Sequence, residues 1–191
     1  MLRTVFTFLF FTANLNISPT FAVTGGEPVK PHEFPFLVSF YIDGTWNGLV
    51  GALIGPRHVL TCKHCFEGKE AELIEVGFGK TVRDNDEGVL KRQVQRVVFH
   101  PTLDFAILVL GAEAPLSEHV KLIGLSEAGS DFSGQNATLA GPGALGPDWD
   151  RTGNCQGDSW GPSVSFLRPW IDREMNKKSP EITSRAERPM W

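Results

Sequence analysis

Three short segments of the sequence carry side chains whose types suit a single chemistry. His64 lies at a turn after an apolar run, Asp104 precedes a second apolar run, and Ser159 lies in a glycine-rich turn. A serine hydroxyl is a poor nucleophile at neutral pH unless a neighbouring base takes its proton, and a histidine base needs a carboxylate that fixes its tautomer. The three residues together therefore predict nucleophilic catalysis.

The turn around Ser159 offers a second element of that chemistry. Its sequence is Cys155-Gln-Gly-Asp-Ser-Trp-Gly-Pro162, and such a turn can aim successive backbone N–H groups into one pocket, which a developing oxyanion requires. Taken singly, a histidine at a strand end, an aspartate before a strand and a serine in a turn all have ordinary structural explanations. Their order, with strand-like sequence around each, favours the catalytic interpretation.

Six short apolar runs separated by turn residues must position these side chains. Their spacing predicts an all-β fold, a small antiparallel barrel or sandwich. The runs are Phe36–Ile42, Gly48–Ile54, His58–Cys62, Leu73–Phe78, Val89–Phe99 and Phe105–Leu110. Asp43-Gly44 and Gly55-Pro56 are typical turn sequences between them.

The strand signal is weaker in the later part of the chain. Leu122–Leu125 and Ala137–Leu139 are possible strands, and the Gly- and Pro-rich stretch 141–147 predicts a loop. Phe166–Lys178 predicts a terminal helix, with Pro169 near its start and two lysines at its end. We expect residues 179–191 to be a frayed tail.

Composition limits the class of protein. The 191 residues are 41% hydrophobic and 21% charged, which is typical of a globular chain long enough to bury a core. The net charge is −4 and no polybasic run occurs, so neither a nucleic-acid partner nor a lipid surface is indicated.

The first 22 residues have the layout of a secretory signal peptide. Arg3 precedes an apolar stretch that is too short to span a bilayer, and a small residue, Ala22, ends the segment. The alternative is a buried N-terminal helix or a signal anchor. If the protein is secreted, the triplet Asn136-Ala-Thr138 is an expected N-glycosylation acceptor in a surface loop.

Together these motifs resemble those of the chymotrypsin/trypsin-like serine proteases. The resemblance runs from Val23 to Ile171 and rests on four segments: Val23-Thr-Gly-Gly26, Val50-Gly-Ala-Leu-Ile54 with Leu60-Thr-Cys-Lys-His-Cys65, Asp104-Phe-Ala-Ile-Leu-Val-Leu110, and Cys155–Pro162. It implies a chymotrypsin-like antiparallel β-barrel and a secreted endopeptidase that hydrolyses peptide bonds through an acyl-enzyme. Such an enzyme needs no cofactor or metal, and its partners are polypeptide substrates or protease inhibitors.

The resemblance also assigns roles to residues. Ser159 would be the nucleophile, His64 the general base and then acid, and Asp104 the orienting carboxylate. The backbone N–H groups of Gly157 and Ser159 would form the oxyanion hole.

Two further assignments concern activation and specificity. Asp158 would receive the free α-amino group of Val23, and we hypothesise that signal peptidase exposes that amine directly, since Ala22 precedes it. Gly153 lies where the family has its pocket-floor residue, and the lack of an acid there argues against a preference for Arg or Lys.

The second half of the chain departs from the family pattern. We expect a complete first barrel over about 23–112 and a truncated second barrel over about 113–178, because only 11 residues separate Gly143 from Cys155. Trp160 also replaces the glycine that follows the nucleophile in the family.

The cysteines depart as well. The position that usually pairs with Cys65 is Leu49 here. A direct Cys62–Cys65 bridge, which would be strained at a strand end, and pairing of Cys155 with one of the two both remain open. A third alternative is metal or thiol chemistry at Cys62-Lys-His-Cys65, with Cys155 as a fourth zinc ligand. No second ligand pair at zinc-like spacing supports it.

Two other interpretations of the whole protein remain open. One is a secreted, non-catalytic protease homologue that acts as a binding or inhibitory module. The other is a truncated product, from a splice form or an imperfect gene prediction. Oligomeric state and substrate are not indicated by the sequence.

Overall fold

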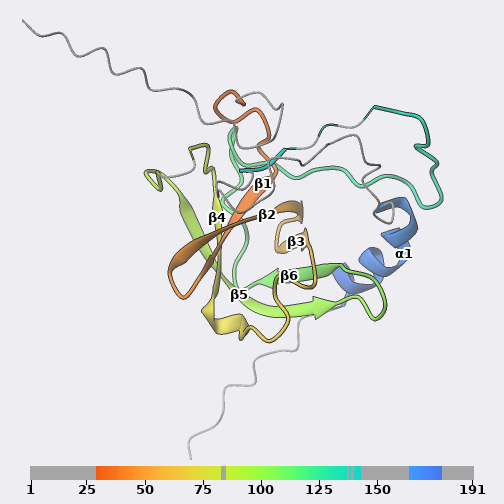
Figure 1. Ribbon diagram of the computed structural model, residues 1–191, viewed down its shortest axis with the longest axis horizontal. Helices are drawn as coiled ribbons and strands as arrows, with labels where there is room; N and C mark the ends of the chain where they lie inside the picture. The colour runs from red at the N-terminus through yellow and green to blue at the C-terminus, as the bar shows by residue number, and fades with distance from the viewer. Residues whose placement is uncertain (1–28, 83–84, 137, 139, 143–163, 178–191) are drawn as a thin grey trace, which may run out of the picture.

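The six predicted apolar runs form the strands of one closed antiparallel barrel (Figure 1). The computed structural model describes residues 29–82, 85–136, 138, 140–142 and 164–177. The elements in these residues are β1 (Leu37–Ile42), β2 (Thr45–Gly55), β3 (His58–Thr61), the 3₁₀ turn η1 (Ala71–Leu73), β4 (Ile74–Phe78), β5 (Leu90–Phe99), β6 (Ala106–Leu110) and helix α1 (Val164–Met175).

The barrel closes in the order β1-β2-β3-β6-β5-β4, so that β4 pairs again with β1. Closure leaves no strand with an unpaired edge, which removes the aggregation hazard of an open antiparallel sheet. The predicted all-β fold class is therefore confirmed. Of the two predicted arrangements, a barrel or a sandwich, the barrel is the one observed.

The β1–β2 hairpin shows how the sequence sets the register. Asp43 and Gly44 both have positive φ, 50° and 72°, as the two-residue hairpin turns that match strand twist require. The turn pairs Ile42 with Thr45, and β2 consequently begins three residues before the predicted start at Gly48. The other five strands end within one residue of their predicted limits.

Strand β6 is buried along its whole length because both of its faces are covered. Ala106, Leu108 and Leu110 belong to the core inside the barrel. Ile107 and Val109, on the opposite face, pack in a second cluster under α1 (Figure 1). An unbroken apolar run is what a strand with two buried faces requires.

Helix α1 docks outside the barrel through Leu167, Trp170 and Ile171, which are all buried. It begins two residues before the predicted start and ends at Met175, three residues before the predicted end. Pro169 lies inside the helix and cannot donate to the carbonyl of Ser165. The N–H of Gly129 donates to that carbonyl instead, at 3.3 Å, which explains why the proline is tolerated.

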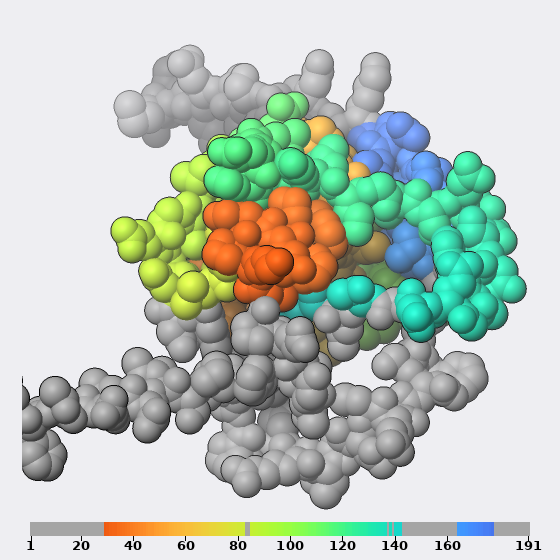
Figure 2. Space-filling view, turned by 90° about the horizontal axis from the view of Figure 1, so that it is seen from above, coloured from red at the N-terminus to blue at the C-terminus, as the bar shows by residue number. Residues whose placement is uncertain are grey.

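Residues 111–136, which follow β6, run as a band over the surface from the barrel towards α1 (green to teal in Figure 2). The predicted strand Leu122–Leu125 is wrong, because this stretch forms no ladder. It makes isolated bonds, from the Lys121 N–H to the Pro35 carbonyl at 3.0 Å and from the Ile123 N–H to the Leu53 carbonyl at 2.9 Å. The possible strand Ala137–Leu139 lies largely outside the described residues.

Among the described helices, neither length nor apolar character is sufficient for one to cross a bilayer. The predicted signal peptide and the tail 179–191 lie outside the described residues.

Candidate active site

The site is built where strands β3 and β6 meet. Thr61, the last residue of β3, pairs with Ala106, the first residue of β6. His64 therefore follows the ladder by three residues and Asp104 precedes it by two, at the same end of the two strands. Antiparallel pairing brings together side chains that are 40 positions apart in the sequence.

Two hydrogen bonds join His64 to Asp104. The backbone N–H of His64 donates to Asp104 Oδ1 at 2.8 Å, and its ring Nδ1 lies 2.6 Å from Oδ2. Both carboxylate oxygens are thus used, which orients the carboxylate and the imidazole together. The two side chains keep 69% and 55% of their surface exposed, so the pair is open to solvent.

The same contacts keep Asp104 ionised. Hydrogen bonds from the His64 backbone N–H, and next from its ring, hold the pKa of the Asp104 carboxyl below its ordinary value. An ionised carboxylate only accepts hydrogen bonds, so Nδ1 of His64 carries the proton. An imidazole with its single proton on Nδ1 has its lone pair on Nε2.

The turn before Asp104 is held by His100, a residue that the sequence analysis did not single out. The ring Nδ1 of His100 accepts the backbone N–H of Leu103 at 3.0 Å, and the backbone N–H of His100 donates to the Phe105 carbonyl at 2.8 Å. The ring of Trp170 packs edge-on against it at 4.9 Å between centroids. Helix α1 therefore supports the Asp104 turn, and the histidine four residues before Asp104 was the available signal.

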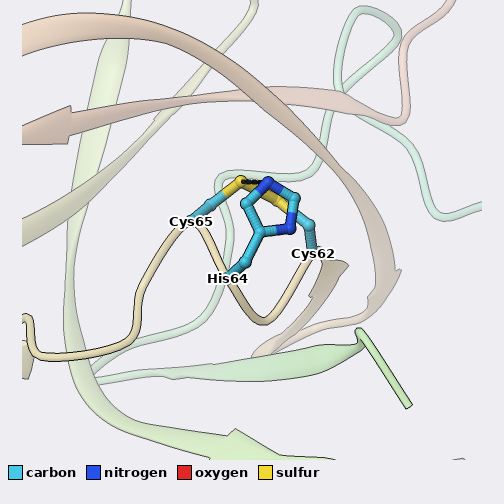
Figure 3. Close-up of side chains that lie close together, drawn as sticks. All are labelled: Cys62, His64 and Cys65. Atoms are coloured by element: carbon cyan, nitrogen blue, oxygen red, sulfur yellow. Dashed lines mark hydrogen bonds between the residues drawn. A yellow bond between two sulfur atoms is a disulfide. The ribbon is translucent and has the colours of Figure 1, made fainter.

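Cys62 and Cys65 form a disulfide that brackets His64 (Figure 3). Of the pairings considered, the direct bridge is the one observed, and pairing of Cys155 with either residue is wrong. In an extended chain, residues three apart are separated by about 10 Å, so a bridge between them would be strained. Strand β3 ends at Thr61, so the chain turns and the two Cα atoms lie 5.8 Å apart, within the usual range.

The disulfide also contacts the imidazole. Nε2 of His64 lies 3.3 Å from Sγ of Cys65, the dashed line in Figure 3. Among the described residues, the donor atoms of Cys62, His64 and Cys65 lie close enough together to hold a metal ion, within 4.8 Å of one another. With the sulfurs bonded to each other, no thiolate is available, which argues against zinc in this state.

The structure does not describe most of the remaining predicted site residues. Val23, Gly153, Cys155, Gly157, Asp158, Ser159 and Trp160 lie outside the described residues. Asn136, the predicted glycosylation acceptor, is exposed, as is Thr138.

The closed six-stranded antiparallel barrel has the chymotrypsin-like fold, and a histidine–aspartate pair lies at one end of its β3–β6 ladder. A family model described as Trypsin matches residues 23–149, which is 127 of the 191 residues. The chain belongs to the trypsin family of serine proteases.

Individual relatives agree with this assignment. The chain is 29% identical to pig azurocidin (Sus scrofa) over 80% of its own length and 58% of the relative's. It is 32% identical to the venom serine protease Bi-VSP of Bombus ignitus, over 55% and 33% of the two chains. A solved structure titled human heparin binding protein aligns with a TM-score of 0.50 at 26% identity, over 57% of this chain and 51% of that one. The chain thus spans between one-third and three-fifths of the length of these relatives.

Proposed function

We propose that this protein is a secreted serine endopeptidase that cleaves peptide bonds through an acyl-enzyme. His64 acts as general base and then general acid, Asp104 orients it, and Ser159 is the nucleophile. The N–H groups of Gly157 and Ser159 stabilise the oxyanion. Polypeptide substrates and protease inhibitors are the expected partners.

One observation carries this proposal: the double hydrogen bond between His64 and Asp104. The ring bond alone would align the imidazole, and the additional bond to the backbone N–H fixes the carboxylate relative to the chain. The result is one defined tautomer, whose Nε2 can take a proton from a nucleophile.

The proposal includes the processing and division of the chain. Signal peptidase removes residues 1–22, and the α-amino group of Val23 then pairs with Asp158. The protease domain spans 23–178, with its first barrel over about 23–112 and a shortened second part over about 113–178. Sequencing the N-terminus of the secreted protein tests the first step, and a start other than Val23 would remove the activating amine.

A fluorophosphonate probe tests the catalytic proposal directly. Such probes react with a serine only when a base and an oxyanion hole activate it. We expect the secreted, processed protein to be labelled and the Ser159→Ala variant to be unlabelled. Ser133→Ala is the matched control, because Ser133 Oγ also donates to an aspartate, Asp131, at 2.6 Å but is an exposed turn residue. Its labelling should equal that of the wild type.

A second function, a non-catalytic homologue that binds other proteins, is favoured by Trp160 and by the short spacing before Cys155. A bulky side chain directly after Ser159 would obstruct the turn that must present the hydroxyl. Absence of labelling in a protein that melts cooperatively would support this function and contradict the peptidase. A chain that shows no cooperative melt would instead support the truncated-product interpretation.

A further inference from the structure

The turn that carries His64 gathers three donor atoms preferred by thiophilic metal ions. Sγ of Cys62, Sγ of Cys65 and a ring nitrogen of His64 all lie within 4.8 Å of one another (Figure 3). The pattern Cys-x-x-Cys is a common source of two zinc ligands, and an imidazole is a common third. All three come from four consecutive residues in the turn that follows β3, so no distant segment has to close on the ion.

The distances fit a tetrahedral ion after one small movement. Zinc bonds of about 2.3 Å to sulfur and about 2.0 Å to nitrogen place a sulfur and a nitrogen ligand roughly 3.5 Å apart. Nε2 of His64 and Sγ of Cys65 are already 3.3 Å apart. Two sulfur ligands would be roughly 3.8 Å apart, so a rotation of the Cys62 side chain away from its present bond completes the geometry.

Asp104 supplies the outer support that such a site needs. A metal-bound histidine usually donates its other ring N–H to a carboxylate, which fixes the tautomer and makes the ligand nitrogen more basic. Nδ1 of His64 lies 2.6 Å from Asp104 Oδ2, and this leaves the lone pair on Nε2, the nitrogen that faces Cys65. The geometry of the candidate dyad is also the geometry of a supported metal ligand.

We propose that reduction of the Cys62–Cys65 disulfide opens a binding site for a thiophilic cation, Zn²⁺ in the first place, held by Cys62, His64 and Cys65. The reductant is a small-molecule or protein thiol. Two thiols of the reductant are oxidised to one disulfide. Their two electrons and two protons pass to Cys62 and Cys65, which become two Sγ–H groups. The ion then displaces both thiol protons and changes no oxidation state. A water molecule completes the fourth position.

The fold does not depend on the bond that must break. The disulfide closes a loop of only four residues, so it constrains the unfolded chain little. The turn is held independently by the β3–β6 ladder and by the backbone bond from His64 to Asp104. The His64 side chain is 69% exposed, so a reductant and an ion can reach this turn from solvent.

The consequence for activity rests on the proposed function. An ion on Nε2 occupies the nitrogen that must accept the proton of Ser159. The reduced, metal-loaded protein would therefore be inactive. Exchange of the two thiols with a small-molecule disulfide, which is itself reduced to two thiols, would re-form the Cys62–Cys65 bond, release the ion and restore the enzyme.

Cobalt(II) titration of the full processed chain tests the site without any reference to catalysis. The protein is reduced, freed of reductant under argon, and titrated with Co²⁺, whose bonds to thiolates give a strong near-ultraviolet charge-transfer band. We expect the band to saturate at one ion per chain, to vanish on addition of Zn²⁺, and to be absent from the oxidised protein. No such band in the reduced, folded protein would overturn the proposal.

Four variants locate the ligands. Cys62→Ser and His64→Gln should each weaken binding more than 100-fold, and Asp104→Asn about 10- to 100-fold, the usual loss when an outer partner of a ligand is removed. Cys155→Ser is the matched control, since it removes the remaining thiol outside the cluster, and it should bind as the wild type does. Loss of binding in Cys155→Ser, or normal binding in Cys62→Ser, would contradict the assignment. His64→Gln, at an exposed position, keeps the test valid if Cys62→Ser fails to fold.

The activity measurement is a separate arm. In the reduced protein, added Zn²⁺ should abolish fluorophosphonate labelling and a chelator should restore it, whereas the oxidised protein should be unaffected. Labelling that persists in metal-loaded protein would contradict the regulatory consequence while leaving the cobalt result to decide the site. A protein that is never labelled would contradict the proposed function alone.

Discussion

Thr61 and Ala106 face each other as the last matched pair of the β3–β6 ladder, and this pairing determines where His64 and Asp104 meet. The two candidate site residues lie just beyond the ladder, one after β3 and one before β6. Strand β6 is buried on both faces, so packing inside the barrel and under α1 holds its position relative to β3. The precision of the site therefore comes from the barrel core and helix α1 rather than from the exposed turns themselves.

Asp104→Asn tests the orienting role in the proposed mechanism. The amide can no longer accept from both the ring and the backbone of His64 and would stabilise the wrong tautomer. We expect kcat for peptide substrates to fall about 10⁴-fold, the loss that this change causes in the serine-protease triad. Asp131→Asn is the control, because Asp131 is an exposed carboxylate that accepts from Ser133. Equal activity of the two variants would contradict the role of Asp104.

Gly51→Ala tests how closely the barrel is packed. A Cβ at Gly51 would lie 2.7 Å from the Phe40 ring and 2.9 Å from the backbone carbonyl of Leu60, and a carbonyl in a ladder cannot move aside. Overpacking of this kind should lower the free energy of unfolding by about 3 kcal/mol. Gly124→Ala is the matched control, since its Cβ would meet no atom within 4 Å. Urea titration of both variants measures the difference, and similar midpoints would contradict the close packing.

Ile171→Ala tests the docking of α1 on the barrel. Ile171 is fully buried among side chains such as Ile107 and Val109, so its truncation should cost about 2–5 kcal/mol of unfolding free energy. Phe166→Ala, on the same helix, removes a side chain that is 70% exposed and should change stability by less than about 0.5 kcal/mol. A helix that does not dock would give two equally small effects in thermal unfolding.

The barrel was predictable because several signals agreed along the chain. Short apolar runs and turn residues such as Asp43-Gly44 located the strands, and the histidine and aspartate at strand ends identified half of the candidate site. What the sequence could not supply was pairing in space. The bond between Cys62 and Cys65 depends on where β3 ends, because residues three apart in an extended chain are about 10 Å from each other.

The errors have equally local causes. Leu122–Leu125 has the composition of a strand, but the barrel is already closed and leaves no edge for it to join. Pro169 was expected near the start of its helix, yet the helix extends two residues earlier because the Gly129 N–H satisfies the carbonyl that the proline leaves free. Neither outcome follows from a local pattern, since both depend on a partner distant in sequence.

The protein's one tyrosine, Tyr41, allows a direct measurement of burial at the barrel. Burial, and next a 2.6 Å hydrogen bond to Asp86, raises the pKa of Tyr41 to about 12. At pH 11 about one-tenth of the folded protein should therefore show tyrosinate absorbance, against about nine-tenths of the unfolded chain. Absorbance at alkaline pH, with and without denaturant, tests this. Identical titration midpoints near 10 would contradict the buried position.

His58 gives the protein a defined weakness in mild acid. Its side chain is half-buried at the start of β3, and burial, then the nearby charges of Arg96 and Arg57, lowers its pKa below the ordinary histidine value. Above that ordinary value the ring is neutral in both the folded and unfolded chain and contributes no pH dependence. As the pH falls through the ordinary histidine pKa, His58 of the unfolded chain takes up a proton before His58 of the folded protein does. The unfolded state is therefore stabilised relative to the folded state.

His58→Gln removes this proton uptake and keeps a polar side chain of similar length. We expect the melting temperatures of variant and wild type to run parallel above pH 7 and to diverge below about pH 6.5, with the wild type falling faster until the folded protein is itself protonated. All other titrating groups are common to both proteins, so the difference between the two curves reports His58 alone. Curves that stay parallel down to pH 5 would mean that the His58 ring is solvated in the folded protein, and a steeper fall in the variant would reverse the sign of the argument.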